Sequence, residues 1–151
     1  MATLNALDPT PEQIKDFLGH PKSGEPVFML NLLKFKGRAT YKDAKTNAEN
    51  DVSGRVAYNR YASGFSALLK EAGMDGGAIF GGNANVMMIG TSDMTLGQNI
   101  KEWDAVAIVK YPDAATMFKM VSSDDYRKIH KHRRAGLAGQ LLISCDDSGV
   151  F

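Results

Sequence analysis

Cysteine is almost missing from this sequence, since Cys145 is the single one among 151 residues. A lone cysteine excludes an internal disulfide framework and favours a reducing compartment, so the cytoplasm is the expected location. Long hydrophobic runs are missing too, because no apolar stretch approaches the ~20 residues that span a bilayer. The first ten residues lack a basic segment followed by an apolar core, and no signal peptide is expected.

An excess of charge of one sign is also missing, because the formal net charge is only +1. This balance gives no general argument for binding nucleic acid or an anionic membrane, and neither is expected as a partner. What remains is ordinary for a globular protein: 44% of the residues are hydrophobic and 23% are charged. The length indicates one domain with a proper core.

The segment 27–36 predicts a β-strand that is apolar on both faces. Alternation places Val27, Met29, Asn31 and Leu33 on one side and the residues between them on the other. A strand of this kind must be covered on both sides. An amide buried at Asn31 costs roughly 1–3 kcal/mol if it has no hydrogen-bond partner. Asn31 therefore has either a structural partner or a ligand.

A helix is expected before this strand and a longer one after it. Thr10-Pro11, with Gln13 following, is typical of a capped helix start, and Gly19 ends that helix within an N-terminal extension of residues 1–25. Residues 37–52 are polar and are expected to form a surface loop that could reshape a pocket mouth. Residues 53–72 carry apolar side chains at spacings of three and four, which predicts the longest helix, ended by Gly73.

The second half of the chain predicts three more strands and two helices. A glycine-rich stretch within 76–90 indicates a strand interrupted at Gly81-Gly82, and residues 91–100 are expected to form a loop. A strand over 103–111, a short helix after Pro112, a capped helix from Ser123 to about residue 136 and a last strand over 141–145 follow.

This order of elements is typical of the ferredoxin-like split βαβ unit, an α+β fold. It predicts a four-stranded antiparallel sheet, over residues 26–151, with the helices packed on one face. Because both faces of the first strand are apolar, we expect a second copy of the protein to cover the other face. Two such sheets facing each other form a dimeric α+β barrel.

Several segments resemble one known family. They are Met29-Leu30-Asn31-Leu32-Leu33-Lys34-Phe35, the helix around Tyr58 and Tyr61, Gly76-Gly77, Trp103-Asp104 before Val109-Lys110-Tyr111-Pro112, and Ser123-Asp124-Asp125-Tyr126 with Arg133. Together they resemble the domain of unknown function 1330 family over residues 26–145. The resemblance implies a ferredoxin-like fold that dimerises as an α+β barrel. The wider superfamily implied by it includes cofactor-free monooxygenases, cyclases, isomerases and haem enzymes.

Four candidate ligand-binding residues are Asn31, Tyr58, Tyr61 and Trp103. The amide of Asn31 can both donate and accept hydrogen bonds, which suits a carbonyl or hydroxyl group of a ligand. Tyr58 and Tyr61 lie on the core face of the long helix, either as core aromatics or as the lining of a cleft between helix and sheet. Trp103 opens the third strand and points to the face opposite its neighbour Asp104.

Two candidate charged residues could pair with each other or with a ligand. Asp104 lies on an apolar side of its strand and is either paired at the strand end or a general base. Arg133 shares a helix face with Tyr126 and Leu137, so its guanidinium is expected to be drawn inward. A partly buried arginine needs an acid, which would be Asp104 or a ligand carboxylate.

His130 is the second candidate catalytic residue and lies in a basic cluster at the end of the last helix. The cluster complements the helix dipole, and it lacks the interleaved aromatic residues typical of nucleic-acid binding. His130 and His132 are two apart and point to different sides of a helix, so no metal site is expected.

The favoured hypothesis is a small-molecule enzyme without a metal or redox cofactor, acting on a carbonyl-bearing or aromatic substrate. Arg133 and Asn31 would hold an oxyanion or carboxylate, and Asp104 or His130 would move a proton. The alternatives are a homodimer that binds a ligand without turnover, and a structural dimer whose polar core groups satisfy one another.

Overall fold

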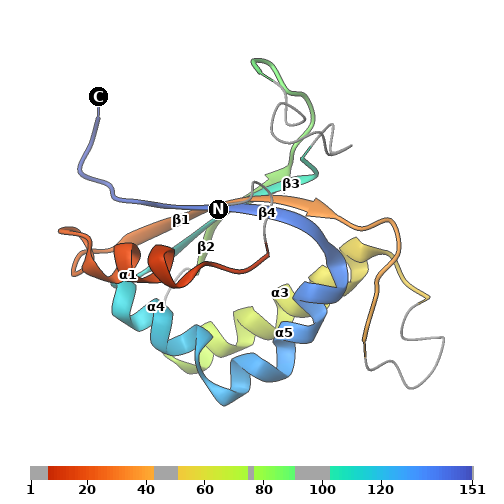
Figure 1. The fold of residues 1–151 in the computed structure, drawn as a ribbon, viewed down its shortest axis with the longest axis horizontal. Helices are drawn as coiled ribbons and strands as arrows, with labels where there is room; N and C mark the ends of the chain where they lie inside the picture. The colour runs from red at the N-terminus through yellow and green to blue at the C-terminus, as the bar shows by residue number, and fades with distance from the viewer. Residues whose placement is uncertain (1–6, 43–50, 75–76, 91–102, 151) are drawn as a thin grey trace.

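A computed structural model of the chain describes residues 7–42, 51–74, 77–90 and 103–150. Within these ranges, four strands form one antiparallel sheet and four helices lie against one face of it (Figure 1). No helix in the described ranges is both long and apolar enough to cross a bilayer. The elements in chain order are α1 (Pro11–Gly19), β1 (Val27–Phe35), α3 (Gly54–Glu71), β2 (Ala78–Asn83), β3 (Ala105–Tyr111), α4 (Ala114–Val121), α5 (Asp124–Gly136) and β4 (Leu137–Cys145).

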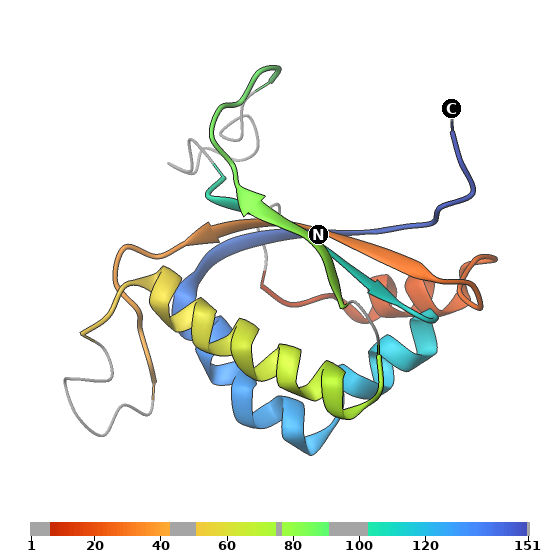
Figure 2. The ribbon, with the colours of Figure 1, turned by 180° about the vertical axis from the view of Figure 1, so that it is seen from behind.

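The strands lie in the order β2-β3-β1-β4, and every neighbouring pair is antiparallel. The predicted α+β fold with a split βαβ connectivity is therefore confirmed. In β1, buried and half-buried residues alternate, with Val27, Met29, Asn31 and Leu33 facing the helices. Figure 2, seen from behind, shows the same two layers, with α3 and α5 side by side beneath the sheet.

The helices begin at the residues that the sequence indicates. The Thr10 hydroxyl accepts a hydrogen bond from the Gln13 amide, and the Gln13 side chain returns one to the Thr10 amide, which is the predicted capping box. Ser53 and Ser123 cap α3 and α5 in the same way through their hydroxyls. Gly73 follows α3 with a φ of 70°, a backbone conformation that glycine adopts without steric cost.

Two predicted strand boundaries are wrong. The last strand begins at Leu137 rather than Leu141, because α5 ends at Gly136 and the chain enters the sheet directly. The second strand runs through Gly81-Gly82 without interruption, and its irregularity lies between Ala78 and Phe80. Residues 85–90 leave the sheet. The predicted loop over 91–100, Gly76 and residues 43–50 of the predicted 37–52 loop lie outside the described residues.

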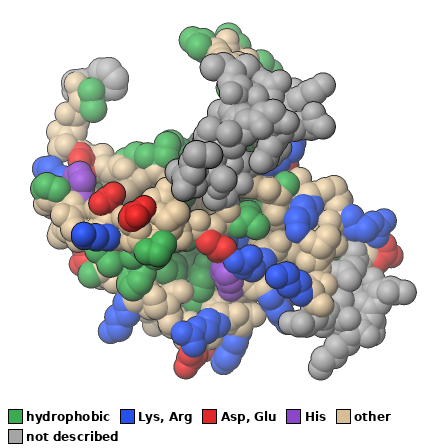
Figure 3. All heavy atoms as spheres, viewed as in Figure 1, with side chains coloured by type: hydrophobic (Ala, Val, Ile, Leu, Met, Phe, Trp, Pro, Cys, Tyr) green, Lys and Arg blue, Asp and Glu red, His purple; other side chains and the backbone are tan. Residues whose placement is uncertain are grey.

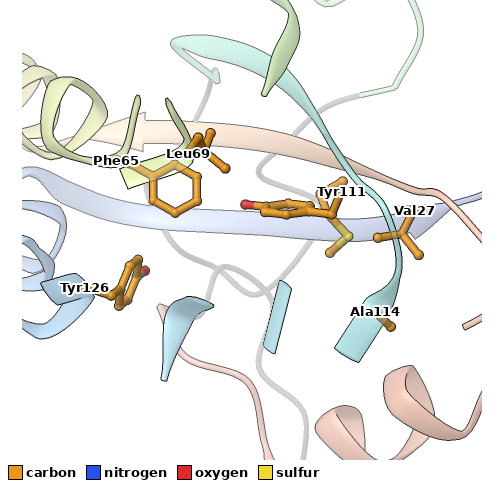
Figure 4. Packing of buried hydrophobic residues seen from close by; sticks show 7 residues of the cluster. Val27, Phe65, Leu69, Tyr111, Ala114 and Tyr126 are labelled. Carbon is orange, nitrogen blue, oxygen red and sulfur yellow. The ribbon is translucent and has the colours of Figure 1, made fainter. Parts of the chain in front are cut away.

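The core lies between the sheet and the helices. Figure 4 shows the cluster from close by, with Tyr111 and Val27 on the sheet side and Phe65, Leu69 and Tyr126 on the helix side. The Tyr111 ring lies along the sheet, and its hydroxyl points toward Phe65. Aromatic rings therefore fill much of the space between the sheet and the helices, where the candidate site lies.

The face of the sheet that no helix covers is apolar. We call it the open face, and the strand registers assign its residues. Ile143 and Phe80 expose half or more of their surface there. Residues 84–90 and the C-terminal residues 146–150 extend on the same side of the sheet, away from the helices (Figures 1 and 2). The open face consists of the apolar residues Phe28, Leu30, Leu32, Phe80, Val106, Ile108, Leu141, Ile143 and Cys145, together with Lys34 and Lys110 near the strand ends.

Candidate functional site

The buried amide of Asn31 is the first group of a chain of hydrogen-bonded side chains that runs from Asn31 through Gln140 to Arg133. Its Nδ2 donates to the backbone oxygens of Met29, at 3.0 Å, and Ala107, at 3.3 Å. Its Oδ1 accepts a hydrogen bond of 2.7 Å from Nε2 of Gln140 on the neighbouring strand. Both amides are more than nine-tenths buried. The question that the sequence leaves open is thus answered, because Asn31 has structural partners and both of its donors are used.

Arg133 continues the chain from Gln140 toward the surface. Its Nη2 donates to Oε1 of Gln140 and to the backbone oxygen of Leu7, and its side chain is only 12% exposed. The carboxylate of Asp8 lies 3.8 Å from Nη1 and also pairs with Arg134. The predicted inward position of Arg133 is confirmed, and the acid that it needs is Asp8.

A close crossing of backbones places α3 beside α5 at this point. The Lys36 amide donates to the Gly136 oxygen at 2.8 Å, and the Gly54 amide donates to the Lys36 oxygen at 3.0 Å. A Cβ atom on Gly54 would lie 2.2 Å from the Lys36 oxygen, and one on Gly136 would lie 2.4 Å from the Gly54 oxygen. Only glycine fits at either position. Tyr58 lies four residues after the first glycine and Arg133 three before the second, so the crossing brings them together.

Four tyrosines, here called the phenol cluster, lie between the sheet and the helices: Tyr58, Tyr61, Tyr111 and Tyr126. Arg133 lies close enough to Tyr58 and Tyr61 to lower their pKa. The hydroxyls of Tyr61 and Tyr126 share a hydrogen bond of 3.0 Å. The Tyr58 and Tyr61 rings lie 5.3 Å apart, and the Phe35 ring lies 5.3 Å from that of Tyr58 at a tilted angle. Tyr58 and Tyr61 are thus packed among other aromatic rings, and their predicted role in lining a ligand site stays a prediction.

Two hydroxyls of the phenol cluster have no hydrogen-bond partner in the described part of the chain. They belong to Tyr58, which is largely buried, and to Tyr111, which is only 3% exposed. A buried hydroxyl left unpaired costs about 1–3 kcal/mol, so such groups are normally satisfied by water or a ligand. Because the Tyr58 hydroxyl lies near a partly buried arginine, this region is the candidate ligand-binding site.

Burial keeps three phenols of the cluster, Tyr58, Tyr61 and Tyr111, protonated. It raises the pKa of Tyr58 to about 12, against a smaller opposing effect of the Arg133 cation. Burial also raises the pKa of Tyr61 and Tyr111 well above the usual value, helped by the neighbouring Tyr126. At neutral pH the three phenols can therefore donate hydrogen bonds, and with the guanidinium they form a region rich in donors.

The edge of β4 is where this interior meets the surface. Leu142 pairs with Asn31 and so points to the helix side, yet it is 46% exposed. His130 lies nearby on α5, half-buried, with its ring 5.5 Å from that of Tyr126. Figure 3 shows cationic and acidic side chains close to a histidine on this face of the molecule. His130 is thus a half-buried titratable group beside Tyr126.

The pKa of His130 is lowered from 6.5, first by burial and then by the cations Arg133 and Arg134. The unfolded chain therefore takes up a proton as the pH falls below about 6.5, before the folded protein does, so the folded state loses stability over that range. We expect the free energy of unfolding in urea to decline between pH 7.5 and 5.5, and to decline less in His130→Asn. An equally steep decline in the variant would contradict this. His132, whose pKa is also lowered by burial, accounts for part of the remaining slope.

Asp104 does not meet Arg133, which corrects one of the predicted pairings. Its carboxylate accepts a 2.8 Å hydrogen bond from the Phe35 amide and lies 3.3 Å from Nζ of Lys34. The side chain thereby closes the end of β1, so the geometry gives no support to its predicted role as a base. Trp103 was expected to open the third strand, but it lies just before β3 and has no ring contact with any described residue.

Sequence reasoning missed Gln140, Tyr111 and Asp8. Gln140 falls in the part of β4 that was assigned to no strand, although a polar residue in alternation with Leu137 and Leu141 is the signal that could have found it. Tyr111 stands at the end of β3, where a tyrosine is ordinary. Asp8 lies 125 residues before Arg133, and no local pattern connects the two.

A second polar group lies on the other side of α5. The Tyr41 hydroxyl is 2.7 Å from Nδ1 of His132, and Arg60 donates to the same hydroxyl at 3.2 Å. His130 and His132 thus contact different parts of the protein, as their spacing predicts. In the described ranges no three histidine, cysteine or acidic side chains are grouped so that they could hold a metal ion.

Comparison with known proteins gives structural likenesses alone. No family model and no curated protein matches the chain. A crystal structure of methylated RPA0582 protein is similar, with a TM-score of 0.78 and 28% identity over 98% of each chain. A second, of RPA0582, a protein of unknown function from Rhodopseudomonas palustris, has a TM-score of 0.75 and 28% identity over 96% of this chain and 98% of that one. The α+β fold is shared along nearly the whole length.

Proposed function

We propose that this chain is a homodimeric small-molecule-binding protein that takes a carbonyl-bearing or aromatic ligand between the sheet and the helices. The observation that supports it best is the pair of unpaired, buried hydroxyls on Tyr58 and Tyr111, the first of which lies near the Arg133 guanidinium. Three protonated phenols and one cation supply donors and few acceptors. The complementary ligand is one that presents acceptor oxygens, such as a carbonyl, a carboxylate or an enolate, next to a flat apolar body.

A reaction in this site would need no cofactor. The donors around Arg133 would stabilise an oxyanion, as in a cyclase, an isomerase or a cofactor-free monooxygenase. His130 is the remaining group for proton transfer, because its lowered pKa leaves a neutral imidazole near pH 7. We also propose that the chain is a member of the domain of unknown function 1330 family. Because it has a single cysteine, we propose the cytoplasm as its compartment.

The open face supports the homodimer. Its side chains are apolar on all four strands except for Lys34 and Lys110 near the strand ends, and monomeric proteins rarely leave an apolar surface of that kind in water. A second copy packed face to face would bury both sheets and complete the barrel. The fold already uses its helices on the opposite face, so the same chain is the simplest cover.

Native mass spectrometry of the freshly purified protein, followed by denaturing release of bound molecules, tests both parts. A dimer that carries one small molecule per chain would support the proposal and supply the class of ligand. A dimer that binds no member of a panel of aromatic acids and ketones would favour the structural alternative. A monomer would contradict the dimer.

Removing the unpaired hydroxyls should separate stability from binding. In Tyr58→Phe and Tyr111→Phe we expect the unliganded protein to be as stable as before or more stable by up to about 1 kcal/mol, since a buried group without a partner is lost. Affinity for the released ligand should fall about tenfold, the worth of one hydrogen bond. Chemical unfolding and titration calorimetry measure the two effects.

Tyr61→Phe is the matched control, because its hydroxyl is paired with Tyr126 at 3.0 Å. This variant should lose about 1 kcal/mol of stability. If Tyr58→Phe and Tyr111→Phe destabilised the protein as much as Tyr61→Phe does, both hydroxyls would have partners within the protein. The main support for the binding site would then be gone.

The second candidate is a structural dimer without a ligand. The polar chain from Asn31 through Gln140 to Arg133 favours it, since each of these groups has protein partners. A double-mutant cycle between Gln140 and Arg133 distinguishes the two. Coupling in stability that no ligand alters would favour the structural role.

A further inference from the structure

A short N-terminal segment contacts Arg133 of the candidate site. We call residues 7–9, which precede α1, the N-terminal strap. In Figure 1 it runs from α1 between the sheet and α5. The Leu7 oxygen accepts a hydrogen bond from Arg133, and the Asp8 carboxylate pairs with Arg133 and Arg134. One end of the strap is fixed, because the Thr10 capping box begins α1, and Phe17 and Leu18 of that helix pack on the core.

The contacts of the strap on Arg133 are those that a ligand carboxylate would make. An arginine typically holds a carboxylate through two parallel N–H···O bonds. Here a backbone oxygen fills the Nη2 position, while the Asp8 oxygen lies 3.8 Å from Nη1, beyond hydrogen-bond distance. The guanidinium therefore faces three oxygens of the protein itself, from Leu7, Gln140 and Asp8, in place of one well-seated carboxylate.

The strap is also weakly held at its acidic residue. Asp8 exposes 47% of its side chain, and its second partner, Arg134, is exposed to a similar degree. Ion pairs of this exposure contribute little to stability. By contrast, Arg133 is 12% exposed and lies close enough to Tyr58 to lower its pKa. A carboxylate that reached Arg133 from the β4 edge would gain a buried cation and a phenol donor that Asp8 does not use.

We infer that Asp8 occupies the position of a ligand carboxylate, and that the ligand of this site is a small aromatic carboxylate which displaces the strap from Arg133. This inference rests on the proposed function. It adds that the ligand is negatively charged and that the N-terminal strap occupies Arg133 when no ligand is bound. In the unliganded protein the strap neutralises Arg133. In the liganded protein the carboxylate is held by the guanidinium, and the aromatic body lies against the rings of the phenol cluster.

Titration calorimetry with benzoate on the full chain tests this inference. Asp8→Asn removes the competing charge and should bind benzoate up to about fivefold more tightly than the unmodified protein, the factor expected from an exposed ion pair. Asp16→Asn is the matched control, because it removes the same charge from α1 at an exposed position without an ion pair in the described chain. Its affinity should equal that of the unmodified protein. Arg133→Lys keeps the charge but loses the two-pronged geometry, and it should bind at least tenfold more weakly.

The outcomes separate this inference from the proposed function. Equal benzoate affinity in Asp8→Asn and the unmodified protein, with loss in Arg133→Lys, would overturn the role of the strap and leave the binding site intact. If neither protein took up benzoate while native mass spectrometry found another bound molecule, the carboxylate would be overturned as the ligand class. If the purified protein carried no bound molecule and bound none that was added, and if Tyr58→Phe changed neither stability nor binding, the proposed function itself would be overturned. Because Asp8 is exposed, Asp8→Asn is expected to fold, and melting curves check this for Arg133→Lys.

Discussion

The substitution Ile143→Asp is expected to convert the proposed homodimer into a folded monomer. Ile143 lies on the open face and is 50% exposed in the single chain, so a carboxylate there remains hydrated and costs the monomer little. In a face-to-face dimer, the two-fold symmetry would place two such charges in an apolar interface. Burying a charge without a partner costs several kcal/mol, and each 1.4 kcal/mol is tenfold in the dissociation constant. We expect the dissociation constant to rise by at least about 100-fold, measured by analytical ultracentrifugation.

Ser144→Asp is the matched control for this experiment. Ser144 is the next residue on β4, it is also exposed, and it pairs with Met29 on the helix side of the sheet. The same charge is thereby introduced one residue away on the opposite face. Ser144→Asp should remain dimeric. A dimer that tolerates Ile143→Asp at micromolar concentration would place its interface elsewhere and remove the open face from the barrel proposal.

Much of the fold could be predicted because local signals agreed with one another. Thr10 with Gln13, Ser53 and Ser123 are capping residues whose side chains act within one turn, and they begin helices where the sequence indicates. The alternation of β1 also gave the correct inward set, including Asn31. The boundary of β4 was missed because α5 passes into the strand at Gly136 without a loop. Residues 137–140 therefore carry no turn signal of their own.

The candidate site was only partly predictable because its contacts are not local. Arg133, His130, Tyr58 and Tyr61 lie on helix faces, and the 3.6-residue period indicates which way they point. Their partners cannot be read in that way. Asp104 was expected near Arg133 on grounds of charge alone, yet the amide of Phe35 and the ammonium of Lys34 hold it at the end of β1. The acid that does reach Arg133 comes from a segment before α1, which the pattern of charges does not connect to α5.

The substitution Gly136→Ala is expected to destabilise the protein strongly, because the added methyl group meets backbone atoms of α3. Its Cβ would lie 2.4 Å from the Gly54 oxygen and 2.8 Å from the Tyr58 amide nitrogen. Both are backbone atoms and cannot rotate away, so relief requires α3 and α5 to separate. Overpacking of flexible side chains costs about 1–3 kcal/mol, and a backbone clash should cost at least 3 kcal/mol. Urea unfolding followed by circular dichroism measures the loss.

Gly37→Ala provides the control, because it adds a methyl group close to the same crossing where no atom lies within 4 Å. Its stability should be unchanged or slightly higher, since alanine restricts the unfolded chain. Gly64→Ala lies between the two, because its Cβ would meet the Ile129 side chain, which can shift. If Gly136→Ala were as stable as Gly37→Ala, the two helices could separate freely at this point. The crossing would then not be what holds Tyr58 beside Arg133, and the geometry of the site would have to depend on the Gln140 and Asn31 chain alone.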